Sequence, residues 1–138
     1  MSNRHNSNIL KILLVEDSKS DAYLIQETLN ESKIPHQLSW VKNGVEALDF
    51  LCKRSKYAHV PLPDLILLDL NMPKKNGQEV LVDLKANDDL KNIPVVVITT
   101  SARQEDIAKV SQIQASYYLV KPVEFEQLIS VVRSLLPA

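Results

Sequence analysis

Four short apolar runs in this chain each end at a polar residue that can take part in chemistry. The runs are residues 12–15, 65–68, 95–98 and 119–120, and they are followed by Glu16 and Asp17, by Asp69, by Thr99 and by Lys121. Runs of about four to six apolar residues are typical of buried parallel strands, and ligands bind outside the carboxyl ends of such strands in open α/β sheets. The sequence therefore predicts that three carboxylates, one hydroxyl and one ammonium group meet at one edge of a sheet.

Apolar runs alternate five times with segments whose apolar residues recur at helical spacing. Strands are expected at residues 11–15, 37–41, 65–70, 95–98 and 117–120. Helices are expected at about 22–32, 45–52, after Gly77, at 104–112, and from Val123 or Glu124 to Leu135 or Leu136, the last of them burying Phe125. Ser18 or Ser20 is expected to cap the first helix. This alternation predicts an α/β fold, a doubly wound parallel sheet with helices on both faces.

Length and charge restrict the class of protein. A chain of 138 residues fits one domain, which we place at residues 9–138 after a polar, disordered start at residues 1–8. Sixteen Lys and Arg residues nearly balance seventeen Asp and Glu residues, so a net charge of −1 provides no general field for nucleic acid or an anionic membrane. No apolar run is long enough for a signal peptide or a membrane span, so we expect a cytoplasmic protein.

Cysteine and glycine usage excludes other classes. Cys52 is the only cysteine, which rules out an internal disulfide, and we expect it to be a small buried hydrophobic residue. Gly44 and Gly77 are the only glycines, so neither the dinucleotide fingerprint GxGxxG nor the P-loop pattern can be written in this sequence. Residues 53–63 are polar and contain two prolines, which predicts a surface loop.

The residue types at the predicted edge suit phosphoryl chemistry. Carboxylates within a few ångströms raise one another's pKa unless a cation lies between them, and an all-oxygen set prefers a hard ion such as Mg²⁺. One oxygen of Asp69 would bind the metal while the other attacks phosphorus to form an aspartyl phosphate. The Lys121 ammonium and the Thr99 hydroxyl would then neutralise further phosphoryl oxygens.

Each of these residues also has an ordinary structural explanation. An acidic pair after a strand is more often a helix N-terminal cap than a metal site. Asp69 and Thr99 could be plain strand-end residues, and Lys121 could be a solvated charge. However, four such coincidences would all have to fall at the same end of four different strands, so the joint functional interpretation is favoured.

The sequence resembles the receiver domain of two-component response regulators from about Leu10 to Leu136. The resemblance is carried by Leu14-Val15-Glu16-Asp17, Leu67-Leu68-Asp69-Leu70-Asn71-Met72-Pro73, Gly77, Pro94-Val95-Val96-Val97-Ile98-Thr99-Thr100 and Tyr118-Leu119-Val120-Lys121-Pro122. It implies a flavodoxin-like, five-stranded parallel sheet of strand order 2-1-3-4-5 with five helices. It also implies a single-domain, CheY-like response regulator in a two-component phosphorelay.

The resemblance assigns a role to each residue of the predicted site. Asp69 would accept a phosphoryl group from a histidine kinase, and Lys121 would bind that group. Asp17 would be a direct ligand of Mg²⁺, as would Asp69 and the main-chain carbonyl of Asn71, and Glu16 would act mainly through metal-bound water. The protein would catalyse its own phosphotransfer and slow dephosphorylation without being an enzyme for a separate substrate.

By the same resemblance, Thr99 would be the switch hydroxyl and Tyr118 the switch aromatic. Phosphorylation would change the face formed by the fourth helix, the fifth strand and the fifth helix, and with it the affinity for a downstream partner. Tyr117 and Ile113 would lie near this face. The bond between Lys121 and Pro122 would be cis, aiming the lysine inward.

A narrower resemblance is to the small stand-alone receivers paired with bacterial phytochrome kinases, as in cyanobacteria. It rests on the long loop at residues 53–64 and on the stretches at residues 70–77 and 98–101. It implies an upstream phytochrome-type histidine kinase and a homodimer through the fourth helix, the fifth strand and the fifth helix.

Two other functions compete with this interpretation. A phosphorylation-independent adaptor would use the same fold in one fixed state, and a hydrolase would form an aspartyl phosphate as an intermediate. Such hydrolases generally carry a second acid two residues after the nucleophile, where this chain has Asn71.

Trp40 and Tyr23 are expected to pack against helices rather than to stack on bases, since no basic stripe accompanies them. His36 and His59 have no spacing that suits zinc.

Overall fold

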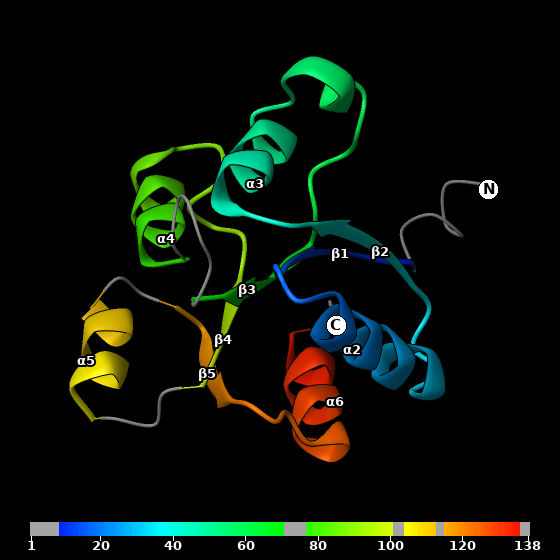
Figure 1. Ribbon diagram of the computed structural model, residues 1–138. Helices are drawn as coiled ribbons and strands as arrows, with labels where there is room; N and C mark the ends of the chain where they lie inside the picture. Colours follow the sequence, from blue (N-terminus) through cyan, green and yellow to red (C-terminus); the bar gives the residue numbers. More distant parts are fainter. Residues whose placement is uncertain (1–8, 71–76, 101–103, 113–114, 136–138) are drawn as a thin grey trace.

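The computed structural model describes residues 9–70, 77–100, 104–112 and 115–135. Within these ranges five strands alternate with five α-helices and one short 3₁₀ helix (Figure 1). The strands are β1 (Leu10–Val15), β2 (His36–Val41), β3 (Leu65–Asp69), β4 (Val95–Thr99) and β5 (Tyr117–Val120). The helices are α2 (Lys19–Glu31), α3 (Gly44–Leu51), η1 (Ser55–Tyr57), α4 (Gly77–Ala86), α5 (Gln104–Gln112) and α6 (Phe125–Ser134).

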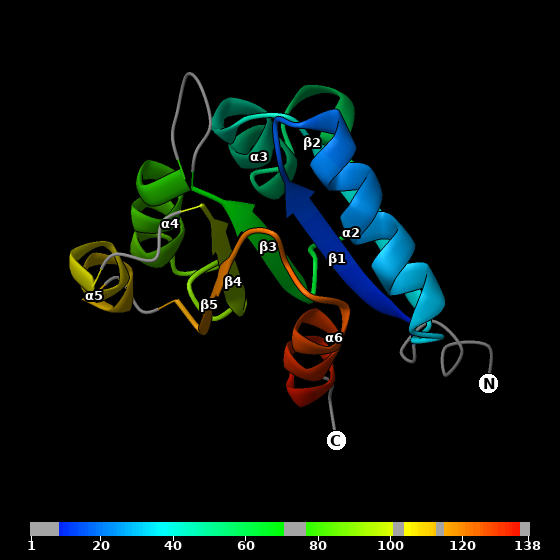
Figure 2. The same ribbon diagram turned by 60° about the horizontal axis from the view of Figure 1, so that its bottom comes forward.

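The strands form one parallel sheet in the order β2-β1-β3-β4-β5. This is the predicted doubly wound α/β fold, and the predicted strand order is confirmed. Helices α2 and α6 cover one face, and α3, α4 and α5 cover the other (Figure 2). Among the described residues, no helix is long and apolar enough to cross a membrane.

Alternate residues of each central strand supply the two halves of the core. In β1, Leu13 and Val15 pack into the layer of α3, α4 and α5, whereas Ile12 and Leu14 pack against α2 and α6. Strands β3 and β4 show the same two-residue period. A sheet buried on both faces needs apolar residues at successive positions, which is why its strands appear in the sequence as unbroken apolar runs.

Caps fix where the first two helices begin. The Ser18 hydroxyl accepts a hydrogen bond from the Asp21 N–H at the start of α2, so Ser18 rather than Ser20 is the N-cap. At the start of α3, the side chain of Asn43 accepts from the Glu46 N–H. Each cap satisfies a backbone donor that has no partner within the helix.

Three predictions about burial are wrong. Cys52 is exposed, because it is the C-cap residue of α3, where the chain leaves the core. Phe125 is 40 % exposed, because the buried stripe of α6 begins one turn later at Leu128. Tyr23 on α2 is 60 % exposed and Trp40 on β2 is 37 % exposed, although both line a small cavity with Ala22.

The segment predicted as a surface loop is partly structured. It contains η1, and Tyr57, Val60 and Leu62 pack against the core layer of α3, α4 and α5. The rings of Phe50 and Tyr57 lie with their centroids 5.1 Å apart, within the range of favourable aromatic pairs. Leu136, Ile113 and the N-terminal segment at residues 1–8 lie outside the described residues.

Candidate functional site

The strand registers bring the predicted polar residues to one edge of the sheet. Val15 at the end of β1 pairs with Leu68, and Asp69 at the end of β3 pairs with Ile98. Thr99 at the end of β4 pairs with Val120 of β5. Glu16 and Lys121 directly follow β1 and β5, so all four strand ends carry their polar groups to the same side of the molecule.

Three carboxylates form a compact acid cluster, which we define as Glu16, Asp17 and Asp69. One ligand oxygen from each residue lies within 4.8 Å of the others. Glu16 and Asp69 are buried, and Asp17 is exposed. The cluster therefore has a solvent-facing side formed by Asp17 and a dry interior formed by the other two acids.

The Lys121 ammonium is shared among three carboxylates. Its Nζ lies 2.9 Å from Asp21 Oδ2, 3.0 Å from Glu16 Oε1 and 3.4 Å from Asp69 Oδ2. The backbone of Lys121 is held by its N–H, which donates to the Thr99 carbonyl at 2.7 Å. The peptide bond between Lys121 and Pro122 is cis, as the resemblance implied.

The pKa values of Glu16 and Lys121 are both raised, but burial contributes to the rise only for Glu16. Burial raises the pKa of Glu16 from 4.5 to about 7, and the adjacent Asp69 adds to the rise while Lys121 opposes it. For Lys121, burial acts to lower the pKa, but the ion pairs with Asp21, Glu16 and Asp69 outweigh burial and raise the pKa above its usual value. The charge of Lys121 is thus shared among several acids, and it does not offset the effect of burial and of Asp69 on the pKa of Glu16.

The acid cluster fits a divalent cation. Glu16 Oε2 accepts a hydrogen bond from the Ser18 N–H at 3.2 Å. Glu16 Oε1 is buried and has Lys121 at ion-pair distance, yet it makes no hydrogen bond of acceptable geometry with any of the described residues. Burying a carboxylate oxygen without a hydrogen bond destabilises the folded state, and a hard cation bound by oxygen ligands would give this oxygen a partner.

Gly77 allows the first turn of α4 to approach the end of β3. A Cβ atom at this position would stand 2.5 Å from the Asp69 carbonyl oxygen and 2.6 Å from Leu70 Cα. Both are backbone atoms that cannot move without displacing the strand end, so only glycine fits here. The Gly77 N–H also donates to the Leu70 carbonyl at 3.3 Å. Gly77 therefore helps to hold Asp69 in place.

Thr99 and Tyr118 lie at different levels of the sheet. Thr99 is buried at the end of β4 beside the acid cluster's edge, whereas Tyr118 pairs with Val97, two residues before that end. Tyr118 is half-buried and packs against the core layer of α3, α4 and α5. Asn71, which was predicted to contribute a main-chain carbonyl, lies outside the described residues.

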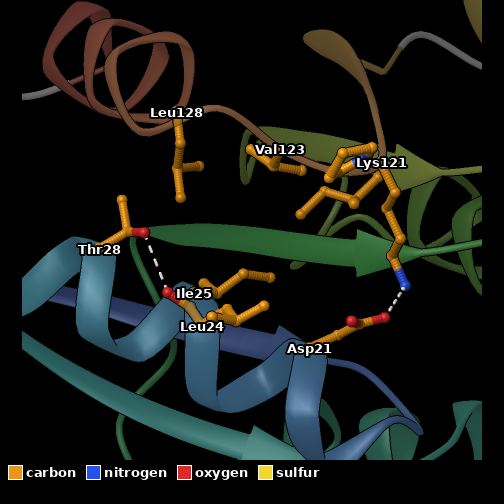
Figure 3. Close-up of a pocket in the computed structure, with 9 residues that line it drawn as sticks. Asp21, Leu24, Ile25, Thr28, Lys121, Val123 and Leu128 are labelled. Atoms are coloured by element: carbon orange, nitrogen blue, oxygen red, sulfur yellow. Dashed lines mark hydrogen bonds and ion pairs between the residues drawn. The ribbon is translucent and has the colours of Figure 1, made fainter.

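Sequence reasoning missed Asp21, which pairs with Lys121. Asp21 lies in the first turn of α2, and its side chain points across to the ammonium group (Figure 3). Both residues line the rim of a small cavity between α2 and α6, of about 90 Å³, whose apolar walls include Ile25 and Leu128. The one available signal was an acid four positions after Asp17, and acids are common in first turns of helices.

This fold and this site define a receiver domain. The family model of the response regulator receiver domain matches residues 12–133, and the chain belongs to that family. Its members are signalling proteins rather than a classical enzyme family. The predicted family membership is confirmed.

The similar proteins that have been characterised include phytochrome response regulators. The chain is 46 % identical to response regulator Rcp1 of Synechocystis sp. over 124 residues, which are 90 % of this chain and 84 % of Rcp1. The crystal structure of the phosphorylated cyanobacterial phytochrome response regulator RcpA has a TM-score of 0.81 at 44 % identity, covering 92 % of this chain and 91 % of RcpA.

A third comparison concerns metal binding. The crystal structure of the Mn²⁺-bound form of Rcp1 has a TM-score of 0.81 at 43 % identity, and the match covers 94 % of this chain and 99 % of that chain. Receiver domains bind a divalent metal, and the acid cluster described above has the ligand chemistry that such an ion needs.

Proposed function

We propose that this protein is a response regulator that accepts a phosphoryl group on Asp69 from a histidine kinase. The observation that carries the proposal is the Lys121 ammonium, 3.4 Å from Asp69 Oδ2, beside two further acids that can bind a cation. An attacking carboxylate, a metal site and a fixed cation are the parts that phosphoryl transfer to an acid requires, since catalysis consists mainly of positioning and charge neutralisation.

The acid cluster would hold Mg²⁺. Asp17 and Asp69 are proposed as direct ligands together with the main-chain carbonyl of Asn71, and Glu16 would act mainly through water. When bound, the metal supplies positive charge to one phosphoryl oxygen and offsets the repulsion among the acids. The ion-pair contacts of Glu16 and Asp69 with Lys121 provide part of this compensation in its absence.

Asp69 would do the bond-forming step. One of its carboxylate oxygens attacks phosphorus, the bond between phosphorus and the kinase histidine nitrogen breaks, and the imidazole keeps the electron pair. The Lys121 ammonium and the Thr99 hydroxyl would stabilise the phosphoryl oxygens. Slow hydrolysis of the aspartyl phosphate by water at the same site would return the protein to its resting state.

The output would be a population shift at one face of the molecule. Thr99 moves toward the new anion, and Tyr118 turns inward, so the surface of α5, β5 and α6 changes its partner affinity. A homodimer through this face is part of the proposal. It is supported by the edge position of β5 and by Tyr117, which is 41 % exposed on that strand.

The upstream partner is proposed to be a phytochrome-type histidine kinase in the cytoplasm. The support is the likeness to RcpA, which is described as a cyanobacterial phytochrome response regulator, and to Rcp1. Phosphotransfer from such a kinase, compared with transfer from kinases of other signal classes, tests this pairing. Faster transfer from a kinase of another class would contradict it.

Mass spectrometry tests the central proposal. The protein is incubated with Mg²⁺ and acetyl phosphate, and the intact mass is expected to increase by one phosphoryl group. Asp69→Asn should abolish the increase. Asp64→Asn is the matched control, because Asp64 lies at the opposite end of β3, where its side chain accepts from the Lys11 N–H at 2.9 Å.

Two results would contradict the proposal. An unmodified wild-type protein that still binds its partner would indicate a phosphorylation-independent adaptor. A mass increase that survives Asp69→Asn would move the phosphoryl group to another residue.

A further inference from the structure

The closest ion-pair contact of the Lys121 ammonium is with a residue outside the acid cluster. Its Nζ lies 2.9 Å from Asp21 Oδ2 and 3.4 Å from Asp69 Oδ2, and the geometry of both contacts is that of a hydrogen bond. Glu16 Oε1 of the acid cluster lies 3.0 Å from the same Nζ, so the ammonium is divided between α2 and the cluster and lies nearer to Asp21 and Glu16 than to the proposed phosphoacceptor.

Asp21 differs from the other partners of Lys121 in its surroundings. Its side chain is 39 % exposed, whereas those of Glu16 and Asp69 are almost completely buried. It lies in the first turn of α2, on an element that contributes no residue to the acid cluster. Asp21 therefore contacts the ammonium from the solvent-exposed side, whereas Glu16 and Asp69 contact it from the buried side.

The neighbouring side chains leave the ammonium little other choice of partner. Lys121 and Asp21 lie at the rim of the cavity between α2 and α6, and Ile25, Val123 and Leu128 line its interior (Figure 3). A charged group is not stable in such an apolar space. The ammonium therefore finds its charged partners only on the α2 side, at Asp21, and in the acid cluster, at Glu16 and Asp69.

We propose that Asp21 is a positioning residue that holds the Lys121 ammonium toward α2 and competes for it with a phosphoryl group on Asp69. This inference rests on the proposed function, since it requires Lys121 to bind that group. Phosphorylation replaces the single negative charge of the Asp69 carboxylate by the nearly two negative charges of the phosphoryl group, and this draws the ammonium toward the group. The contact with Asp21 opposes this movement, so Asp21 lowers the affinity of the site for the phosphoryl group.

Beryllofluoride binding measures this competition without turnover. Wild type and Asp21→Asn are titrated with beryllofluoride at saturating Mg²⁺, and binding is followed by the fluorescence of Trp40. Since partly exposed ion pairs contribute little, Asp21→Asn is expected to bind roughly two- to five-fold more tightly. Asp21→Glu keeps a carboxylate within reach of the ammonium and is expected to return the affinity to the wild-type value.

A charge-matched variant separates contact from net charge. Ser20 is exposed and adjacent to Asp21 on α2, so Ser20→Asp combined with Asp21→Asn restores the local charge but not the contact. This double variant is expected to bind beryllofluoride as tightly as Asp21→Asn alone. Wild-type affinity in the double variant would overturn the inference, because the effect would then come from the general field.

The outcomes also separate this inference from the proposed function. If wild type binds beryllofluoride and Asp21→Asn binds it equally or more weakly, the positioning role is overturned and the proposed function stands. If wild type itself does not bind beryllofluoride with Mg²⁺, the proposed function fails, and the inference fails with it. Urea unfolding checks that each variant is folded, and Asp21→Ser replaces Asp21→Asn with the same expectation if the latter does not fold.

Discussion

The indole N–H of Trp40 donates a hydrogen bond of 2.7 Å to the main-chain carbonyl of Glu16. Trp40 belongs to β2, and Glu16 directly follows β1, which pairs with β2. The only tryptophan of the chain is therefore bonded to the backbone of an acid-cluster residue. A change at the cluster that moves Glu16 must also change the surroundings of this indole.

We predict that Mg²⁺ alone changes the fluorescence of Trp40. A saturable change in emission is expected, and Glu16→Gln should weaken the apparent Mg²⁺ affinity by about ten-fold or more, as is typical when a group supporting a metal ligand is lost. Glu46→Gln, a change in α3 outside the cluster, serves as the control. Calorimetric binding of Mg²⁺ without any change in Trp40 emission would contradict the coupling.

The pKa of Glu16 predicts how the metal-free protein responds to pH. Because the folded state raises this pKa from 4.5 to about 7, it binds more protons than the unfolded chain between these values. The free energy of unfolding should therefore be highest below pH 4.5 with respect to this group, and should fall by up to about 3 kcal/mol as pH rises through 7.

Urea unfolding at several pH values without metal checks this prediction. Glu16→Gln should remove most of the decrease, because its amide does not titrate. Added Mg²⁺ should reduce the decrease in wild type by stabilising the ionised carboxylate. Identical pH profiles for wild type and Glu16→Gln would show that another group is responsible.

Gly77→Ala should damage both stability and the site. The added methyl group meets the Asp69 carbonyl and Leu70 Cα, so α4 or the end of β3 must shift. We expect a loss of about 1–3 kcal/mol in urea unfolding, as for other overpacked positions, and weaker binding of beryllofluoride. Val82→Ala on the same helix is the control, since Val82 is 50 % exposed and should change stability little.

Lys121→Ala should separate phosphoryl binding from metal binding. The ammonium would contact the phosphoryl group, so beryllofluoride affinity should fall by about ten-fold or more, the usual effect of losing a hydrogen bond to a charged group. The same ammonium now pairs with Glu16 and Asp69, so its removal should leave Mg²⁺ affinity equal or higher. An equal loss of both affinities would contradict the assignment.

The strand-end residues could be predicted from the sequence because a parallel sheet orders them. Asp69 and Thr99 each follow an apolar run, and the registers of β3 and β4 place them at one edge without any knowledge of side-chain packing. The position of Asp21 could not be predicted this way. It meets Lys121 across one hundred residues of sequence, and that contact depends on how α2 lies against the link between β5 and α6.

The burial of residues at helix ends could not be predicted from the sequence either. The spacing of Phe125 relative to Leu128 and Ile129 suits a buried stripe, yet periodicity does not state where a helix extends past the sheet that it covers. The role of Tyr118 came from resemblance alone, since a half-buried tyrosine in an edge strand has no chemical pattern of its own.

Successive side chains of β3 point to opposite faces of the sheet, so the acid cluster depends on the register of this strand. Asp69 lies at the same edge as Glu16 only because Leu68 pairs with Val15 and Ile66 with Leu13. A single residue inserted within β3 would move each following side chain of the strand to the opposite face of the sheet. The Asp69 carboxylate would then point away from Glu16. Residues 53–63 precede β3, so an insertion or deletion there does not change which residues of β3 point to each face.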